Sequence, residues 1–481
     1  MIFSNIDFND EEPIYIQIKN NIKDMIAKGM LNKGSKLPST RELSEILNVS
    51  RNSVISAFEE LKDEGVIHSQ KGKGTFVSIS NVYKENTWNI NWDEKYNNYA
   101  NLCEELDIVK SEIPWEKDLI SFKSISPQGE LFDIDEIKKS FLNRISLEGH
   151  KLLNYGYAKG YQPLINYLLS YMEDKGVDTS NKDILITNGF TEGLDIILSS
   201  FTKSGDTIIC ENPTHNTAIK LFKVYDLNIV GIDMTDNGMD LEILEKELKN
   251  NDVKLSFVVP SYHNPTGIVM RHKERYELYN LMKKYNVPII EDGFNEELLH
   301  TGSHICPIVA LDGESNGVLY IGSFSKVLFP GMRIGWILAD KSIISKLESV
   351  KRCKNIHVSF LDQAILYDYL NNGSFEKYMK KIKKFYKEKY EFALECVKKY
   401  IHTDYIMGEG GLHIFLKLDN INSRELLTRC YEKGVIFMCG DVFYTDDSGH
   451  DTLRLGFSRL DFEDIEKGIK RIGSVIDELR K

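Results

Sequence analysis

The sequence lacks the features that would place the chain in a membrane or in an oxidising compartment. No run of uncharged apolar residues approaches the roughly 18 that span a bilayer. The start, MIFSNIDFNDEEP, has neither the basic nor the apolar part of an export signal. The seven cysteines are scattered, odd in number and without a C-x-x-C pair, which argues against a disulfide framework. We therefore expect a cytoplasmic protein with reduced thiols, no membrane contact and no metal site.

Length and charge suggest more than one domain. At 481 residues the chain is longer than one hydrophobic core usually serves. Its 42% apolar and 27% charged residues are typical of a folded globular protein and exclude disorder over most of the chain. The formal net charge of −12 argues against a protein that coats nucleic acid with its whole surface. Residues 13–80 differ, because eight Lys and two Arg exceed two Asp and five Glu there and leave a charge of +3.

The first eighty residues predict three short helices followed by a hairpin. Apolar residues recur at helical spacing over 14–26, and Ser39 with Glu42 forms a capping box before a second helix. Ser50 caps a third helix, whose first turn carries Arg51 and small polar side chains. Two helices joined by so tight a turn suit insertion of the second into the major groove of DNA. Spacing alone equally allows a helical hairpin that only packs.

The segment VIHSQKGKGTFVSIS alternates like a β-hairpin around a loop with two lysines, no acid and two glycines. Glycine lets a backbone approach phosphate closely, so this loop suits a DNA-binding wing. Taken in order, PIYIQI, LPSTRELSEILNVSRNSVISAFEELKDEGVI and GKGTFV resemble the GntR family of winged helix-turn-helix regulators across residues 13–77. The resemblance implies double-stranded promoter DNA as a partner. It implies contacts to this DNA from Arg41, Ser50, Arg51, Ser53, Lys71 and Gly72.

An Asn-rich, charged stretch follows the hairpin and has no sustained apolar period beyond a short helix near 100–110. Such composition is typical of a segment between domains. We predict a GntR-type winged helix-turn-helix domain over 1–80, a linker over 81–112 and a large domain over 113–481.

From residue 115 onward, short β-rich runs alternate with helical patterns. The runs lie at 183–187, 206–210, 255–260, 287–292 and 318–325. This alternation predicts βαβ units and therefore an α/β fold with a mainly parallel sheet. Ligands of such open sheets bind outside the carboxyl ends of the strands.

Polar residues stand at those strand ends. Asp292 ends VPIIED, Asn264 follows LSFVVP, Lys326 follows VLYIGSFS with Arg333 seven residues later, and 189–191 open a helix. Together they suit a phosphorylated pyridine aldehyde: the lysine amine forms a Schiff base and a carboxylate pairs with the ring nitrogen. An amide suits the ring hydroxyl, and a cation with helix-start N–H groups suits the phosphate. Each residue alone has an ordinary alternative, as a helix cap, a common turn or a solvated charge.

Considered jointly, these motifs in residues 115–481 resemble fold type I aminotransferases, which use pyridoxal 5′-phosphate. The resemblance implies a smaller C-terminal α+β subdomain over about 345–481 beside the parallel-sheet domain. It implies that Lys326 is the catalytic lysine, and that Arg454 in LRLGFSRL binds the substrate α-carboxylate. Strand alternation alone also allows Arg454 to be a plain exposed arginine. The resemblance to the aminotransferases further implies cofactor contacts from Lys326, Asp292, Asn264, Arg333, Ser323, Phe190, Thr191, Tyr155 and His215, with Tyr155 reaching the partner subunit's phosphate.

Two positions depart from the family's pattern. Phe294 in EDGF replaces a tyrosine that would share the ring hydroxyl with Asn264. His215 in ENPTHNTA replaces the aromatic residue that usually stacks on the cofactor ring. Imidazole can stack, donate a hydrogen bond or titrate near neutral pH, so the tuning of the cofactor is open.

A GntR-like winged helix joined to an aminotransferase-like domain is the plan of the MocR subfamily of bacterial regulators. The resemblance implies a homodimer that senses an amino acid or related amine through external aldimine formation at Lys326, with little or no turnover. One alternative is an active aminotransferase that retains the DNA-binding arm, and another is a structural fusion without cofactor. We favour the regulator because a DNA-reading helix and wing have no use in metabolism. The effector, the operator and the sign of regulation are not encoded in any recognisable motif.

Overall fold

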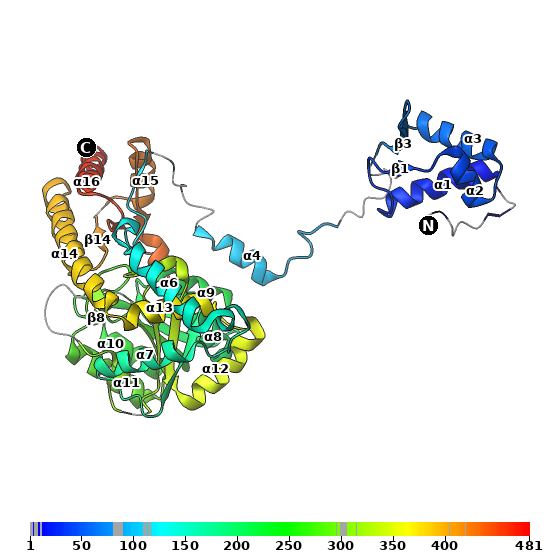
Figure 1. Cartoon of the computed structure of the whole chain (residues 1–481). Coiled ribbons are helices and arrows are strands. Elements are labelled where there is room, and N and C mark those ends of the chain that lie inside the picture. The colour runs from blue at the N-terminus through cyan, green and yellow to red at the C-terminus, as the bar shows by residue number, and fades with distance from the viewer. Residues whose placement is uncertain are drawn as a thin grey trace. The chain divides into compact units, whose positions relative to one another are not determined.

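The computed structural model describes the chain except for residues 1, 2, 4–7, 10, 11, 80–89, 109–112, 114, 115, 117, 295, 299–304, 314, 404 and 419. The chain divides into two compact units, Met1–Tyr96 and Asn97–Lys481, which are drawn in Figure 1. Part of the predicted linker, 81–89 and 109–112, lies outside the described residues. Its described part contains α4 (Asn98–Glu105), close to the predicted short helix. The boundaries at 80, 112 and 345 stay predictions.

The first unit has the predicted order of three helices and a hairpin. Its sheet has the strand order β1-β3-β2, and β2 and β3 form the antiparallel hairpin. The apolar faces of the helices meet in one core that includes Ile18, Leu43 and Leu61. The elements are α1 (Ile14–Ala27), β1 (Lys36–Leu37), α2 (Thr40–Leu47), α3 (Arg51–Asp63), β2 (Ile67–Gln70) and β3 (Gly74–Val77).

Both predicted N-caps are confirmed. The Ser39 hydroxyl accepts a hydrogen bond from the Glu42 N–H, and the Glu42 carboxylate accepts one from the Ser39 N–H at 2.8 Å. The Ser50 hydroxyl accepts from the Ser53 N–H at 3.1 Å. These bonds satisfy N–H groups that a helix start would leave without partners, which fixes where α2 and α3 begin.

The second unit is built on a mainly parallel sheet, as predicted. The strand order among the described residues is β5-β12-β11-β10-β9-β6-β7-β8. Strands β11, β10, β9, β6 and β7 run parallel to one another. Strand β12 is antiparallel to both its neighbours, and β8 is antiparallel to β7. The strands are β5 (Lys182–Thr187), β6 (Thr207–Asn212), β7 (Asn228–Thr235), β8 (Gly238–Met239), β9 (Val253–Val258), β10 (Ile289–Asp292), β11 (Val318–Ser323) and β12 (Gly335–Asp340).

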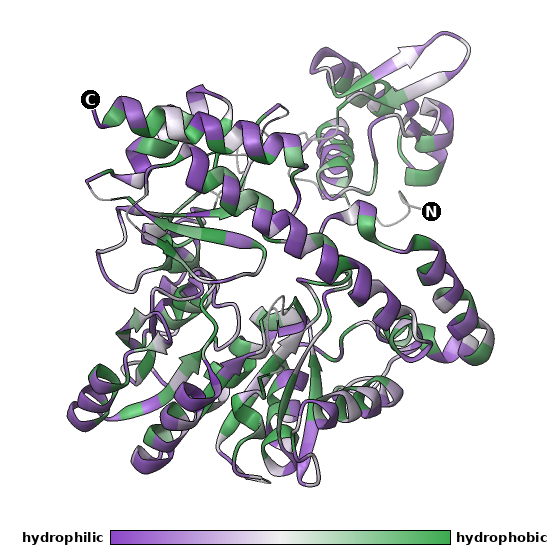
Figure 2. Cartoon of the chain, turned by 90° about the vertical axis from the view of Figure 1, so that its left-hand side faces the viewer, coloured by the Kyte–Doolittle hydropathy of each residue, from purple (hydrophilic) through white to green (hydrophobic). Residues whose placement is uncertain are grey.

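Helices cover this sheet and bury nearly continuous apolar strands, as parallel sheets require. In Figure 2 the strands are mostly green, while the helices around them carry purple, hydrophilic faces. The helices are α6 (Ile134–Glu148), α7 (Gln162–Asp174), α8 (Gly189–Phe201), α9 (Asn216–Val224), α10 (Leu241–Asn250), α11 (His272–Tyr285), α12 (Lys341–Lys354) and α13 (Phe360–Asn371), with the 3₁₀ turns η2 (Gly149–Leu153), η3 (Glu296–Leu298) and η5 (Pro330–Met332).

A second core lies in the C-terminal part of the chain. Its antiparallel sheet has the order β13-β14-β17-β16, and β15 pairs in parallel with β4 from residues far upstream. Helix α14 serves both cores: Phe375 to Tyr386 pack in the large core, and Tyr390 to Val397 pack in the second. Figure 1 shows α14 extending from the large sheet to α16. The elements are β4 (Ile120–Ser121), α14 (Ser374–Tyr400), β13 (Tyr405–Met407), β14 (His413–Lys417), α15 (Ser423–Glu432), β15 (Val435–Ile436), β16 (Met438–Cys439), η6 (Gly440–Phe443), β17 (Thr452–Gly456) and α16 (Phe462–Leu479).

Among the described residues, no helix combines the length and the apolar character that crossing a bilayer requires.

Candidate functional site

A cavity of about 170 Å³ lies at the carboxyl ends of the parallel strands. Strand β10 ends at Asp292, and its parallel neighbour β11 ends three residues before Lys326. Seven of the nine predicted cofactor residues line the cavity, whereas Asn264 and Tyr155 do not. The lining residues are Phe190, Thr191, His215, Thr217, Asp292, Gly293, Phe294, Ser323, Ser325, Lys326 and Arg333.

The two oppositely charged groups of the cavity are both desolvated. Burial, reinforced by the nearby Arg454 and opposed by Asp292, lowers the pKa of Lys326 to about 8. Burial raises the pKa of the Asp292 carboxyl well above its usual range, with Glu211 adding to the rise. A lysine of this pKa has about a tenth of its amine unprotonated at neutral pH, far more than an ordinary lysine, and the free amine is the form that attacks a carbonyl. A buried carboxylate gains most from a cationic partner such as a protonated ring nitrogen.

The phosphate end of the site is a helix start that glycine keeps open. Helix α8 begins at Gly189, whose φ is +75°, and an added Cβ would lie 2.6 Å from the Arg333 Nη2. Arg333 follows η5 in a left-handed conformation, and its Nη2 donates to the Asn188 carbonyl at 3.4 Å. The N–H groups of a helix start together with a guanidinium suit an anion. These residues therefore fit the phosphate of the predicted cofactor.

His215 stands beside this helix start. Its ring centroid lies 5.1 Å from that of Phe190, and its Nδ1 lies 3.9 Å from the Asp292 Oδ2. Burial, reinforced by the nearby Lys326 charge, lowers the pKa of His215 to about 3. The imidazole is therefore neutral at neutral pH, and titration in that range, one of the three alternatives, is wrong. Stacking and hydrogen bonding stay open as roles for the ring.

Arg454 and Asn264 contact each other next to the cavity. The Arg454 Nη1 donates to the Asn264 Oδ1 at 2.7 Å, and its Nη2 donates to the Lys123 carbonyl at 3.1 Å. Arg454 is only 5% exposed, so the alternative of a plain exposed arginine is wrong. Leu453 and Leu455 pack in the second core, as strand alternation predicts. Since neither oxygen partner is charged, the buried guanidinium suits an incoming carboxylate.

Tyr155 lies away from the cavity lining. Its side chain is 81% exposed, and its ring centroid is 6.1 Å from that of His357. Its role across a subunit boundary stays a prediction. Phe294 lines the cavity and is 7% exposed, so this position, where the family resemblance implied a tyrosine, presents no hydroxyl group.

Sequence reasoning missed two polar residues of the lining, Thr217 and Ser325. Ser325 immediately precedes the candidate lysine, and its hydroxyl accepts from the Ser323 hydroxyl at 2.9 Å. Thr217 lies in the first turn of α9, directly after the loop that follows β6. A helix start after a strand end was the signal for both the predicted phosphate residues and Thr217.

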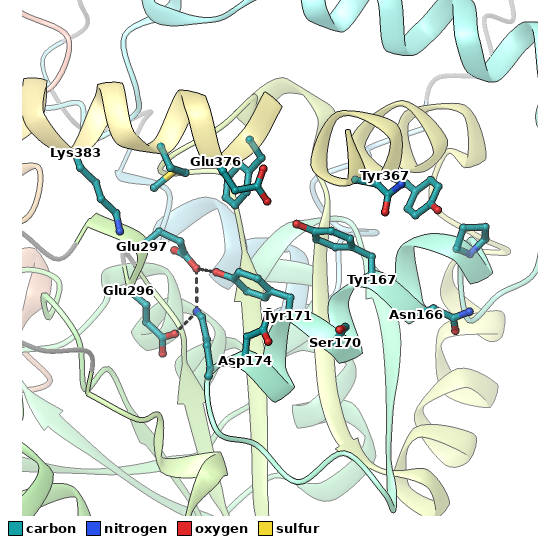
Figure 3. Close-up of a pocket in the computed structure, with 15 residues that line it drawn as sticks. Asn166, Tyr167, Ser170, Tyr171, Asp174, Glu296, Glu297, Tyr367, Glu376 and Lys383 are labelled. Atoms are coloured by element: carbon teal, nitrogen blue, oxygen red, sulfur yellow. Dashed lines mark hydrogen bonds and ion pairs between the residues drawn. The ribbon is translucent and has the colours of Figure 1, made fainter. Parts of the chain in front are cut away.

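A larger cavity of about 860 Å³ lies beside α7, η3 and α14 (Figure 3). At its edge the Lys175 ammonium donates to Glu296 at 2.6 Å and to Glu297 at 3.1 Å. Burial alone would lower the pKa of Lys175, but the two carboxylates raise it well above its usual range. Tyr171 donates a further hydrogen bond to Glu297. This network holds the chain segment that begins directly after Asp292 and so supports the small cavity.

The predicted DNA-binding residues are mostly exposed. Arg51, Lys71 and Gly72 face solvent, and Arg41 is 78% exposed with its Nε 3.2 Å from Glu45. Exposed pairs of this kind are weak, so Arg41 is available to phosphate.

Ser50 and Ser53 are less available to DNA, because their hydroxyls already take part in the N-cap of α3. The Ser50 and Ser53 hydroxyls lie 2.9 Å apart, and Ser53 is half-buried. The contacts of all these residues with DNA stay predictions.

The fold and the site together define a class of protein: a pyridoxal-phosphate domain of aminotransferase architecture joined to a winged helix-turn-helix domain. Residues 117–472 match the aminotransferase class I and II family, and residues 14–77 match the gntR family of bacterial regulatory proteins. The chain belongs to the aminotransferase class I and II family and is a GntR-type regulator of the MocR subfamily. Its cofactor is pyridoxal 5′-phosphate.

Relatives of both kinds are similar to this chain. The HTH-type transcriptional regulator YdfD of Bacillus subtilis is 29% identical over 97% of each chain. Aromatic-amino-acid aminotransferase 1 of Thermococcus litoralis is 33% identical over 76% of this chain and 89% of its own. Among solved structures, Pyrococcus horikoshii kynurenine aminotransferase is 32% identical, with a TM-score of 0.76 over 81% of this chain and 99% of its own.

The lowered pKa of Lys326 predicts how cofactor loading depends on pH. Below about pH 8 the lysine holds its proton, so the rate of imine formation with added cofactor should fall about tenfold per pH unit. Above that pH the rate should level off. Stopped-flow measurement of the imine absorption band, after cofactor is added to the cofactor-free chain, gives this rate. The Lys326→Ala variant should show no imine band. A rate that keeps rising to pH 10 would contradict the assignment.

The close approach of Gly189 to Arg333 at the start of α8 predicts the effect of adding a methyl group at residue 189. Gly189→Ala brings a Cβ within 2.6 Å of the Arg333 guanidinium and should weaken cofactor binding by about tenfold or more. Gly205→Ala is the matched control, because Gly205 has a similar φ of +83° and no atom within 4 Å of the added Cβ. Equilibrium titration with the cofactor should separate the two variants. Equal losses would mean that backbone strain alone causes the effect.

Proposed function

We propose that the protein is a transcription regulator that binds promoter DNA in the cytoplasm and senses an amino acid or related amine at its cofactor. The observation that carries the proposal is the buried Arg454 guanidinium at 2.7 Å from Asn264, beside the cavity that contains Lys326. This arrangement suits a ligand with both an amine and a carboxylate. The exposed start of α3 and the loop between β2 and β3 suit a duplex, which supports regulation as the output.

Each residue has a definite task in this proposal. The cofactor, when bound, supplies the carbonyl carbon with which amines condense. Lys326 would provide the amine that holds this carbon when no effector is bound. Asp292 pairs with the ring nitrogen, and Arg333 with the start of α8 holds the phosphate. Arg454 holds the effector carboxylate, since a guanidinium matches that group with two hydrogen bonds.

An active aminotransferase is the second candidate. The gathering of Lys326, Asp292 and Arg333 around one cavity, with Arg454 beside it, supports this alternative, because catalysis needs the same groups. In that case the released Lys326 amine would also move a proton between the substrate carbon and the cofactor. Sustained release of a keto acid from a panel of amino acids would distinguish this activity from sensing.

The proposal includes a homodimer, and an exposed apolar surface supports it. Large apolar side chains are exposed over residues 142–157, on α6, η2 and the loop that follows. Monomeric proteins rarely expose so many large apolar side chains within one short segment, so a second copy is a fitting partner. These residues, with their exposed fractions, are Leu142 (62%), Leu147 (66%), Leu153 (70%), Tyr155 (81%) and Tyr157 (76%).

If the protein is a regulator, its DNA affinity should depend both on the winged helix-turn-helix domain and on the cofactor site of the large domain. The full chain should bind its own upstream DNA, and one member of an amino acid panel should change that affinity by about 5- to 150-fold. Lys326→Ala should keep DNA binding but lose the response. Arg51→Ala should weaken DNA binding about tenfold or more, whereas Lys62→Ala, at the other end of α3, should not. Fluorescence anisotropy at fixed salt measures each affinity. Absence of binding with and without cofactor would refute the regulator.

The apolar surface predicts the oligomeric state. Leu147→Glu combined with Leu153→Glu should yield monomers in sedimentation experiments, because two charges would have to be buried at the subunit boundary. In these monomers the partner's Tyr155 would no longer reach the cofactor phosphate, so cofactor binding should also weaken at least about tenfold. Ile243→Glu, a change of an apolar residue of 36% exposure on α10, should leave the dimer intact. A double variant that stays dimeric with full cofactor affinity would place the interface elsewhere.

A further inference from the structure

The Arg454 guanidinium lies within a small apolar cluster formed by Phe415, Met438 and Phe443. Strand register places Arg454 directly opposite Phe415 on β14 and Met438 on β16, so the three side chains share one face of the sheet. The guanidinium carbon lies 4.8 Å from the centroid of the Phe443 ring. At this distance a cation is attracted to the face of the ring.

The same cluster anchors the segment that follows α4. Ile108 packs against the cluster, and this residue comes three positions after the end of the helix. The helix itself has no fully buried side chain among its described residues, Asn98–Glu105. A cavity of about 500 Å³ lies between residues 105–108 and the residues of α9 and η6. Ile108 therefore attaches this segment to the cluster, in addition to the packing of α4 on α9.

Arg454 also contacts the chain on the other side of residues 109–112. Its Nη2 donates to the Lys123 carbonyl at 3.1 Å, and the Lys123 ammonium donates to the Ile113 carbonyl at 2.8 Å. The contacts of one guanidinium thus lead to residues 108 and 113. The Phe443 carbonyl accepts from the Thr214 N–H at 2.8 Å, which fixes η6 next to the loop that carries His215.

A carboxylate that binds Arg454 changes these contacts. Two hydrogen bonds to a carboxylate use two of the five guanidinium N–H groups and fix the plane of the guanidinium on the ligand. The guanidinium carbon now lies 4.8 Å from the centroid of the Phe443 ring, with its donors on Asn264 and Lys123. Reorientation toward a ligand alters the contact with Phe443 and thereby the cluster of Phe415, Met438 and Phe443 against which Ile108 packs.

We propose that Phe443 is a positioning residue that connects Arg454 to Ile108, so that a carboxylate at Arg454 changes the packing of residues 98–108. This inference rests on the proposed function, because that function places the effector carboxylate at Arg454. It adds the route by which the large domain transmits occupancy toward the N-terminal unit. The route begins at a charge, passes through one aromatic ring and ends at one aliphatic side chain.

The test uses the full chain with two cofactor adducts that differ in one carboxylate. The cofactor-free chain is loaded with N-(5′-phosphopyridoxyl)glycine or with N-(5′-phosphopyridoxyl)methylamine, and absorbance confirms full occupancy. Hydrogen exchange at the amides of residues 98–108 is then compared. In the wild type the two adducts should give rates that differ by at least about threefold, since exchange reports local opening.

Variants test whether the difference in hydrogen exchange passes through Phe443 and Ile108 or reflects a general loss of stability in residues 98–108. Ile108→Ala should reduce the difference between the adducts to less than about 1.5-fold, and Phe443→Leu should do the same. Leu106→Ala is the matched control, because Leu106 is half-buried in the same segment but does not belong to the cluster around Phe443. It should keep the threefold difference. Because Ile108 is only half-buried, its variant keeps the test valid even where Phe443→Leu does not fold.

Two outcomes overturn the inference: equal exchange with both adducts in the wild type, or an undiminished difference in Ile108→Ala. Anisotropy with the upstream DNA, measured on the same samples, keeps the proposed function separate. A carboxylate-dependent change in DNA affinity without a change at 98–108 refutes the route but supports the regulator. A change at 98–108 without any DNA binding supports the route and refutes the regulator.

Discussion

Burial of charge is the constraint on which the rest of the large domain depends. Lys326, Asp292 and Arg454 are withdrawn from water around one small cavity, and each has a pKa shifted by that burial. Such desolvation costs free energy unless partners compensate it. The sheet, the helix start at Gly189 and the network around Lys175 hold these groups in place at that cost. A cofactor that pairs with these charges offsets part of that cost, so binding stabilises the site.

Two of the cavities in the large domain illustrate opposite ways of compensating buried charge. Around Lys175, two carboxylates accept from the ammonium and two phenols donate to those carboxylates, so nothing further is required from a ligand. At Arg454 the partners are two uncharged oxygens and an aromatic ring. We therefore interpret the charge network at the edge of the larger cavity as structural, although that cavity has the greater volume. Volume alone would point to the wrong site.

Much of the fold and of the candidate site could be predicted because local chemistry determined it. Caps at Ser39 and Ser50 fix helix starts, and the strand-end positions of Asp292 and Lys326 follow from parallel topology. Long-range geometry could not be predicted: the antiparallel insertion of β12, the pairing of β4 with β15, and the burial of Arg454 all depend on segments distant in sequence. The low pKa of His215 depends on surroundings that spacing does not reveal.

The antiparallel pairing of β11 with β12 has a consequence for the life of the protein in the cell. Lys326 and Arg333 both lie in the connection between these two strands, so one bound molecule ties both ends of that connection to the start of α8. A ligand that binds only the folded chain stabilises it by mass action. Bound cofactor would thereby shift the balance between the folded and the unfolded chain, so that the stability of the large domain depends on the cofactor concentration.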